Sequence, residues 1–313
     1  MNVVPMPARL FLSSGDLMAD RRFEFARDLQ LKGDLEAAAD LLLQATDLAP
    51  NFASAWFTLG EIRQQLHQHE AAVAAFRRAR AADPDDHHGA GLRLMRLGAE
   101  PLSGMSPAYV QTLFDQYAPR FEAALLDDLG YRGPALLFKS VLSVRAAARK
   151  AAFFKRAIDL GCGTGLAAVA FAREVDRFIG IDLSPRMIER ARATGLYAEL
   201  EIADMAQGLR GKPDTSADLI LAADAMVYVS DLAPVLREAK RVLATGGLLA
   251  FTVETHAGEG VMIGEGLRYA HSAAYVRAQI EAAGLTLSLL EDLSARNEDN
   301  VPAPGLVAVA TKA

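Results

Sequence analysis

The chain has 313 residues, of which 51% are apolar and 23% charged, proportions typical of a water-soluble globular protein with one or two domains. Acidic residues outnumber basic ones by 39 to 33, and the net charge of −6 argues against a nucleic-acid or anionic-membrane surface as the main function. The single cysteine, Cys162, excludes an internal disulfide, and with six scattered histidines it offers no metal-ligand spacing, so we expect a cytoplasmic protein without a metal.

The N-terminal residues 1–19 are predicted to be a flexible leader. Their longest apolar run covers only residues 10–12, so they lack the hydrophobic region of a secretory signal peptide. One of the most apolar stretches elsewhere, residues 219–229, is far shorter than the roughly 20 residues that a membrane-spanning helix needs. We therefore expect no membrane span.

Residues 20–100 are rich in alanine and place apolar residues at helical spacing, which predicts an all-helical domain. When this segment is compared with itself, equivalent residues recur at a period of 34. The pairs that carry the period are Ala38 and Ala72, Ala45 and Ala79, and Pro50 and Pro84. A fixed period of this length indicates stacked helical hairpins.

The second copy of the repeat is the more complete one. Gly60 and Ala72 are small enough for two antiparallel helices to approach closely, whereas Trp56 and Phe76 are large enough to fill the groove between them. Pro84 cannot continue a helix and ends the unit. The pattern therefore predicts a helical hairpin with a defined packing face.

This half of the chain resembles tetratricopeptide repeats, which implies a surface that docks a protein partner. The first copy is imperfect, because Arg22 stands where the second copy has tryptophan. Residues 87–97 are predicted to form the helix that caps the two units. The alternative is a plain helical bundle without repeat geometry.

Residues 101–150 are predicted to link this domain to the next. They contain Phe114, Tyr117 and Phe121, whose spacing by three and four residues fits the buried stripe of a helix. Residues 135–156 carry basic side chains and no acidic one. A solvated helix face is favoured over a nucleic-acid-binding face here, because the charges are spaced and the whole chain is acidic.

Residues 151–313 alternate short apolar runs with helical ones, which is typical of an α/β fold with a parallel sheet. A first strand is followed by Gly161, Gly163 and Gly165, and then by a helix predicted over residues 168–175. A strand, a glycine turn and a helix in this order form a nucleotide-binding unit. Glycine is needed where the backbone contacts a ligand, because a Cβ atom would clash.

Acidic residues stand at the ends of three successive predicted strands: Asp159, Asp182 and Asp204. The carboxyl ends of parallel strands share one crevice, so we expect the three carboxylates to converge on one ligand. Asp182 can accept hydrogen bonds from ribose hydroxyls, and Asp204 can accept one from an adenine amine, with Met205 packing on the ring. Asp159 beside the glycines suits a cofactor with an ammonium and a sulfonium group better than a pyrophosphate.

Five ordered motifs then resemble those of class I S-adenosylmethionine-dependent methyltransferases. They are Asp159-Leu-Gly-Cys-Gly-Thr-Gly, Gly180-Ile-Asp182-Leu-Ser, Ala203-Asp204-Met205, Asp218-Leu-Ile-Leu and Val242-Leu-x-x-Gly-Gly247. The resemblance implies a Rossmann-like sheet of seven strands with the last antiparallel. With the repeats and the Phe114-Asp-x-Tyr-Ala segment, the whole chain resembles bacterial predicted methyltransferases that carry tetratricopeptide repeats.

The resemblance implies S-adenosylmethionine as the cofactor. The glycines would wrap its methionine portion, and Tyr117 in the linker would close over it, with Arg120 as a candidate partner for its carboxylate. The linker would thus cap the cofactor site. The implied cofactor-binding residues are Tyr117, Asp159, Gly161, Cys162, Gly163, Gly165, Asp182, Leu183, Asp204, Met205 and Asp224.

Methyl transfer from a sulfonium is an in-line displacement, so a catalytic base is needed only for acceptors that must lose a proton. The candidate catalytic residues are Tyr228 and His271, and the alternatives are packing for Tyr228 and a surface position for His271. A glycine-rich loop that begins at His256 is predicted to be a mobile lid. Arg296 is a candidate clamp for a substrate carboxylate.

The sequence thus predicts a methyltransferase with a partner-docking helical domain and an unidentified small-molecule or protein acceptor. The alternative is a tetratricopeptide adaptor whose methyltransferase-like domain senses the cofactor or is inactive. A nicotinamide oxidoreductase is disfavoured, because the glycine spacing differs from the dinucleotide pattern and because of Asp159.

Overall fold

The computed structural model describes residues 10–120, 130–264, 266–298 and 300–313. The chain divides between residues 112 and 113 into two compact units, which we call the helical unit and the sheet unit. Among the described residues, none of the helices combines the length and the apolar character that crossing a bilayer requires. The candidate aromatic Phe121 lies outside the described residues.

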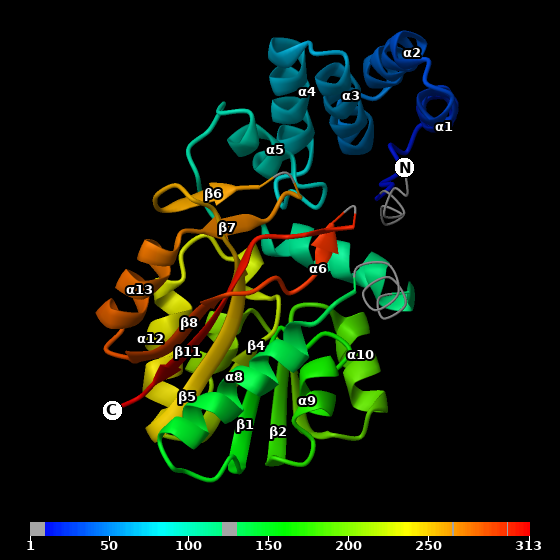
Figure 1. Ribbon diagram of the computed structural model, residues 1–313. Coiled ribbons are helices and arrows are strands. Elements are labelled where there is room, and N and C mark those ends of the chain that lie inside the picture. The colour runs from blue at the N-terminus through cyan, green and yellow to red at the C-terminus, as the bar shows by residue number, and fades with distance from the viewer. Residues whose placement is uncertain (1–9, 121–129, 265, 299) are drawn as a thin grey trace. The chain divides into compact units, whose positions relative to one another are not determined.

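In the helical unit, each of the first five helices packs against the next one in the sequence (Figure 1). Its first helix begins inside the segment expected to be a leader, because the Asp16 carboxylate accepts hydrogen bonds from the amides of Met18 at 2.8 Å and Ala19 at 3.0 Å. The helices are α1 (Leu17–Leu31), α2 (Leu35–Leu48), α3 (Ala53–Gln65), α4 (His69–Ala82), α5 (Ala90–Arg96) and α6 (Pro107–Tyr117), the last of which crosses the division between the units.

The period of 34 residues corresponds to equivalent packing positions in two helical hairpins. Ala38 and Ala45 of α2 are fully buried, as are Ala72 and Ala79 of α4. Trp56 packs against the apolar clusters of both hairpins, and its indole nitrogen donates a hydrogen bond to the Pro50 carbonyl at 2.8 Å. The repeat therefore reflects shared core geometry rather than composition alone.

The predicted capping helix is shorter than expected. The helix α5 begins at Ala90 instead of residue 87, because Gly89 adopts a left-handed φ of +77° and breaks the helical path. The Asp86 carboxylate accepts hydrogen bonds from the amides of Ala90 at 2.6 Å and Gly91 at 2.8 Å, which satisfies two amides at the helix start.

The sheet unit contains the end of α6, the 3₁₀ turn Ala118–Arg120 and α8 (Gly133–Ala147), and then alternates strands with helices. Its strands are β1 (Phe154–Leu160), β2 (Val175–Asp182), β3 (Tyr197–Ile202), β4 (Ala217–Ala222), β5 (Leu243–Glu254), β6 (Val261–Ile263), β7 (Tyr269–His271), β8 (Thr286–Asp292), β9 (Asn297–Glu298), β10 (Val301–Pro302) and β11 (Gly305–Thr311). The intervening helices are α9 (Leu166–Ala170), α10 (Pro185–Ala193), α11 (Met205–Arg210), α12 (Ala233–Val242) and α13 (Ala273–Ala282), with a 3₁₀ turn at Met226–Tyr228.

The main sheet has the strand order β3-β2-β1-β4-β5-β11-β8. Strands β1 to β5 pair in parallel, and β11 lies antiparallel between β5 and β8. The expected Rossmann-like sheet with an antiparallel last strand is therefore confirmed. The order reverses between β1 and β4, and the crevice at such a switch point is the usual ligand site of an open parallel sheet.

Both faces of the sheet are covered, so its central strands are apolar throughout. Leu219 and Leu221 of β4 belong to an apolar cluster with residues of α8 and α9, whereas Ile220 and Ala222 belong to a cluster with residues of α11, α12 and α13. Alternate side chains of one strand thus pack into the opposite layers of helices.

Two expected elements differ in the structure. The helix predicted to end at residue 175 ends at Ala170, because Val175 already pairs with Phe154 at the start of β2. The glycine-rich segment after His256, expected to be a loop, contains the paired strands β6 and β7, and Ala270 of β7 also pairs with β5.

The close approach of α3 and α4 is testable at Gly60, where a Cβ atom would lie 2.6 Å from the Phe76 ring. We expect Gly60→Val to destabilise the helical unit by about 1–3 kcal/mol through overpacking. Urea unfolding monitored by Trp56, the only tryptophan of the chain, measures this. The control is Gly104→Val, where a Cβ atom meets nothing within 4 Å. Equal urea midpoints for the two variants would contradict the close contact between Gly60 and Phe76.

Candidate functional site

The glycine loop after β1 adopts a backbone that other residues rarely adopt. Gly161, Gly163 and Gly165 have φ values of +61°, +54° and +97°, all in the left-handed region. A Cβ atom on Gly161 would lie 2.5 Å from the Cβ of Ala225, so the loop passes directly against the segment that follows β4. This contact lies at the switch point between β1 and β4.

Asp182, at the end of β2, holds the glycine loop in place. Its Oδ2 accepts a hydrogen bond from the Gly163 amide at 2.8 Å, and its Oδ1 accepts one from the Ser184 amide at 2.8 Å. The residue is only 8% exposed, and burial raises the pKa of its carboxyl above the ordinary value, although the amide bonds oppose that shift.

Asp159 lies beneath the same loop and is 1% exposed. Burial raises the pKa of its carboxyl to about 7, with the neighbouring Asp182 contributing in the same direction. Its Oδ2 accepts a hydrogen bond from the Tyr197 hydroxyl at 2.6 Å, which favours the ionised form. Cys162 is buried in the loop, and burial raises the pKa of its thiol well above the ordinary range, so the thiol is neutral.

Asp204 follows β3 and is the N-cap of α11. Its Oδ1 accepts hydrogen bonds from the amides of Ala206 at 2.9 Å and Gln207 at 3.0 Å. The segment lies next to the end of β2, since the Ala203 amide donates to the Asp182 carbonyl at 3.0 Å. Met205 packs at the edge of the apolar cluster on that face.

The end of α6 contacts the loops that follow β2 and β4. The Ser184 hydroxyl donates a hydrogen bond to the Asp115 carboxylate at 2.5 Å. The ring of Phe114 packs edge-on against Tyr228, with 5.1 Å between the centroids. Tyr117, half-buried, stands at the last position of the same helix. The Phe114-Asp-x-Tyr segment is therefore attached to the loops that follow β2 and β4 by both a polar and an aromatic contact.

Arg296, expected to be a clamp for a substrate carboxylate, is instead buried among carboxylates of this chain. Its guanidinium forms ion pairs with Asp224, Glu254 and Glu298. Arg268 pairs with the last two as well. Together they tie the ends of β4 and β5 to the β6–β7 and β9–β10 hairpins. Sequence reasoning missed this cluster, because its members are separated by up to 74 positions between Asp224 and Glu298.

His271 is fully buried, so its alternative as a surface residue is wrong. Its Nε2 donates a hydrogen bond to the Val229 carbonyl at 2.9 Å, and its ring stacks on Tyr275 at 5.6 Å. Burial lowers the pKa of His271 to about 4, so the ring is neutral at pH 7. Among the described residues, Nδ1 has no hydrogen-bond partner. His271 therefore supports the loop that carries Tyr228.

The structure brings together the glycine loop, Asp159, Asp182 and the segment beginning at Asp224. Tyr131 also lies near this region, since burial of its phenol raises its pKa well above the ordinary value and the charges of Asp224 and Asp159 act in the same direction. Sequence reasoning missed Tyr131 and Tyr197. Neither stands in a motif, and the only sequence signal for Tyr197 is a glycine inside the neighbouring strand.

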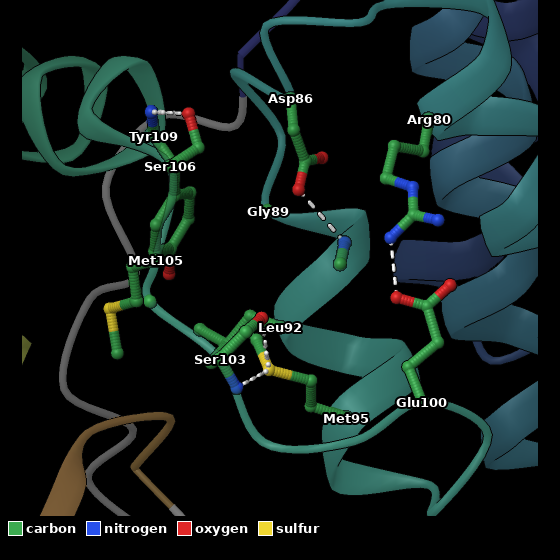
Figure 2. A pocket seen from close by; sticks show the side chains of 12 residues that line it. Arg80, Asp86, Gly89, Leu92, Met95, Glu100, Ser103, Met105, Ser106 and Tyr109 are labelled. Carbon is green, nitrogen blue, oxygen red and sulfur yellow. Dashed lines mark hydrogen bonds and ion pairs between the residues drawn. The ribbon is translucent and has the colours of Figure 1, made fainter. Parts of the chain in front are cut away.

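A separate cavity of about 160 Å³ lies within the helical unit, between α4, α5 and the start of α6 (Figure 2). Arg80 and Glu100 pair across one side of it at 2.5 Å, and the Asp86 carboxylate on another side caps α5. These charged groups are thus paired within the protein. Among the described residues, no group of three or more His, Cys, Asp or Glu side chains is placed to hold a metal ion.

Comparison with known proteins identifies both parts of the chain. Residues 158–251 match a methyltransferase domain, and residues 53–86 match a tetratricopeptide repeat. The strand order is Rossmann-like, and the glycine loop and the three acidic strand ends lie in the segment that matches a methyltransferase domain. A segment that matches a tetratricopeptide repeat precedes it in the chain.

Proteins similar to part of this chain include methyltransferases. The 27-O-demethylrifamycin SV methyltransferase of Amycolatopsis mediterranei (strain S699) is 29% identical over 154 residues, which are 44% of this chain and 57% of that protein. Methyltransferase-like protein 27 of Homo sapiens is 27% identical over 173 residues, or 55% of this chain and 66% of that protein. A solved S-adenosylmethionine-dependent methyltransferase from Mesorhizobium loti covers 54% of this chain and 95% of its own at 21% identity, with a TM-score of 0.42. The chain spans less than two thirds of either curated relative.

The raised pKa of Asp159 predicts how the stability of the ligand-free protein depends on pH. The folded state keeps the carboxyl protonated up to about pH 7, whereas the unfolded chain releases the proton near pH 4. The stabilising contribution is therefore present below about pH 4 and is lost as the pH rises to 7. We expect the melting temperature of Asp159→Asn to fall less than that of the wild type over this range in thermal scans. The exposed Asp176→Asn is the control; parallel curves for all three proteins would contradict the assignment.

Proposed function

We propose that the protein is an S-adenosylmethionine-dependent methyltransferase that transfers a methyl group to a small-molecule or protein acceptor. The observation that carries the proposal is the bond from the Gly163 amide to the Asp182 carboxylate, which shapes a glycine loop at the switch point of the sheet. The matched methyltransferase domain covers this loop and all three acidic strand ends.

The residues present fit this cofactor. Three glycines with positive φ remove Cβ atoms from the loop that would face the methionine portion. Asp182 uses one lone pair of each oxygen for loop amides, so further lone pairs can accept the ribose hydroxyls. Asp204 uses Oδ1 for capping, and its Oδ2 has no hydrogen bond within the described part of the chain, which suits an adenine amine.

When bound, the cofactor supplies an activated methyl group on a positively charged sulfur. The chain has to bind and orient it, and Asp159 places a carboxylate near its cationic end. We propose that Tyr117 covers the cofactor, because Asp115 on the same helix accepts a hydrogen bond from Ser184, two residues after Asp182. The other proposed binding residues are Gly161, Cys162, Gly165, Leu183, Met205 and Asp224.

For acceptors that must lose a proton, we keep Tyr228 and His271 as candidate bases. Tyr228, in the 3₁₀ turn after β4, packs against Phe114 of α6. The neutral His271 has an unprotonated Nδ1, but that atom is buried, so the loop after β4 must move before His271 can accept a proton from a substrate. Tyr228 is therefore the better placed of the two.

For the tetratricopeptide-repeat region we propose the docking of a protein partner. Repeats of this kind expose a continuous surface formed by stacked hairpins. The paired charges of the cavity in Figure 2 favour a structural role for that cavity rather than a second ligand site.

Titration calorimetry with S-adenosylmethionine, S-adenosylhomocysteine and NAD tests the function. We expect binding of both sulfur compounds and no binding of NAD. Transfer of labelled methyl groups into separated protein and small-molecule fractions of a lysate then identifies the acceptor class. Tight binding of NAD without a response to the sulfur compounds would reject the proposal.

The role of Asp182 is testable by Asp182→Ala. We expect the affinity for S-adenosylhomocysteine to fall by about 1–3 kcal/mol, since charge-assisted hydrogen bonds to the ribose are lost and the glycine loop loses its anchor. The control is Asp176→Ala, an exposed aspartate at the opposite end of the same strand. Unchanged affinity of Asp182→Ala in calorimetry would reject the ribose assignment.

A further inference from the structure

Tyr197, at the start of β3, reaches across β2 to a residue of β1. Its hydroxyl donates a hydrogen bond to Oδ2 of Asp159 at 2.6 Å, although the strand β2 lies between β1 and β3 in the sheet. A side chain that spans a whole strand needs a path over that strand. Two features of the local backbone provide this path.

The first feature is a glycine in the middle strand. Gly180 pairs with Asp159 on one side and with Leu200 on the other. A Cβ atom on Gly180 would lie 2.9 Å from Cδ1 and Cε1 of Tyr197 and 2.7 Å from a methyl of Leu200. The ring of Tyr197 therefore occupies the space that any other residue at position 180 would fill.

The second feature is a bulge between β2 and β3. Phe178 pairs with Tyr197, but the next residue, Ile179, pairs with Glu199, so Ala198 is an extra residue in β3. Bulges re-aim the side chains beside them. Here the bulge follows the tyrosine directly, and the Tyr197 ring also packs edge-on against Phe178 at 5.9 Å between centroids.

The same ring also lies beneath the glycine loop. A Cβ atom on Gly165 would lie 3.2 Å from Cε2 of Tyr197 and 3.5 Å from its hydroxyl oxygen. Tyr197 thus contacts the loop that would wrap the cofactor and the carboxyl group below it. One side chain links the position of Asp159 to the position of the loop.

We propose that Tyr197 is a positioning residue that holds the carboxylate of Asp159 beneath the glycine loop and keeps it ready to face the cationic end of the cofactor. The inference rests on the proposed function and deepens it. Among the residues that the structure describes, the titratable groups that interact with Asp159 are Tyr197, Asp182, Cys162 and Tyr131. Of these, Tyr197 is the hydrogen-bond donor that favours the ionised carboxylate, while Asp182 opposes it.

The physical consequence is a pH dependence of binding. Burial raises the pKa of Asp159 to about 7, and the hydrogen bond from Tyr197 acts to lower it. Without that bond the carboxyl stays protonated to higher pH, and the protonated group loses its attraction for an ammonium. The removal of one hydroxyl group should therefore shift the pH profile of cofactor binding rather than weaken binding equally at every pH.

The test is titration calorimetry of S-adenosylhomocysteine from pH 6 to pH 8.5 with Tyr197→Phe, which keeps the ring and its packing. We expect the affinity of the wild type to increase as the pH rises through about 7. The same increase in affinity should occur at higher pH in the variant. At pH 7 the variant should bind about tenfold more weakly, the usual effect of losing a hydrogen bond to a charged group. The difference should narrow toward pH 8.5.

Two further variants make the result specific. Gly180→Ala should shift the profile in the same direction, because its Cβ atom displaces the tyrosine ring. Tyr275→Phe loses a hydroxyl that bonds to Leu232 and Asp231, away from Asp159, and should follow the wild type. Superimposable profiles for wild type and Tyr197→Phe, or an equal shift in Tyr275→Phe, would overturn the inference. A wild type that binds no S-adenosylhomocysteine at any pH would instead reject the proposed function itself.

Discussion

The carboxylate of Asp182 is the group on which the geometry of the site depends. It stands at the end of β2 and accepts the amides of Gly163 and Ser184, so one side chain orients the loop after β1 and the start of α10. Ser184 donates its hydroxyl to Asp115, which attaches the end of α6 to the same point. The buried Asp182 carboxylate therefore connects the glycine loop, the start of α10 and the end of α6 through consecutive hydrogen bonds.

The buried carboxylates at the ends of β1 and β2 differ from those at the ends of β4 and β5 in whether an arginine pairs with them. On the side of β1 and β2, Asp159 and Asp182 are buried close together, and within the described part of the chain neither forms a hydrogen bond with a cationic side chain. Burial raises the pKa of both carboxyls. On the side of β4 and β5, Arg296 compensates Asp224 and Glu254. The uncompensated acids suit a cationic ligand, whereas the compensated ones fix loops in place. Aspartate is thus left without an ion-pair partner at one edge, where we propose that it binds, and is held in an ion pair at the other.

Several features could be predicted because they are local or follow from topology. Gly161, Gly163 and Gly165 lie within five residues, and their conformation follows from the sharp turn between a strand and a helix. The neighbourhood of Asp159 and Asp182 follows from parallel strands, whose carboxyl ends meet at one edge. The helical repeat was visible because its packing positions recur at a constant spacing.

Other features depended on contacts between distant residues and could not be predicted. The sequence by itself determined the strand ends, the glycine loop and the repeat, since each is encoded by residues close together in the chain. Only the tertiary structure decided that Arg296 pairs with acids of this chain, that His271 is buried, and that Tyr197 crosses β2 to Asp159. The reason is that a side chain's partner depends on what the fold places within a few ångströms of it, and a missing Cβ at Gly180 becomes meaningful only when its neighbours are known.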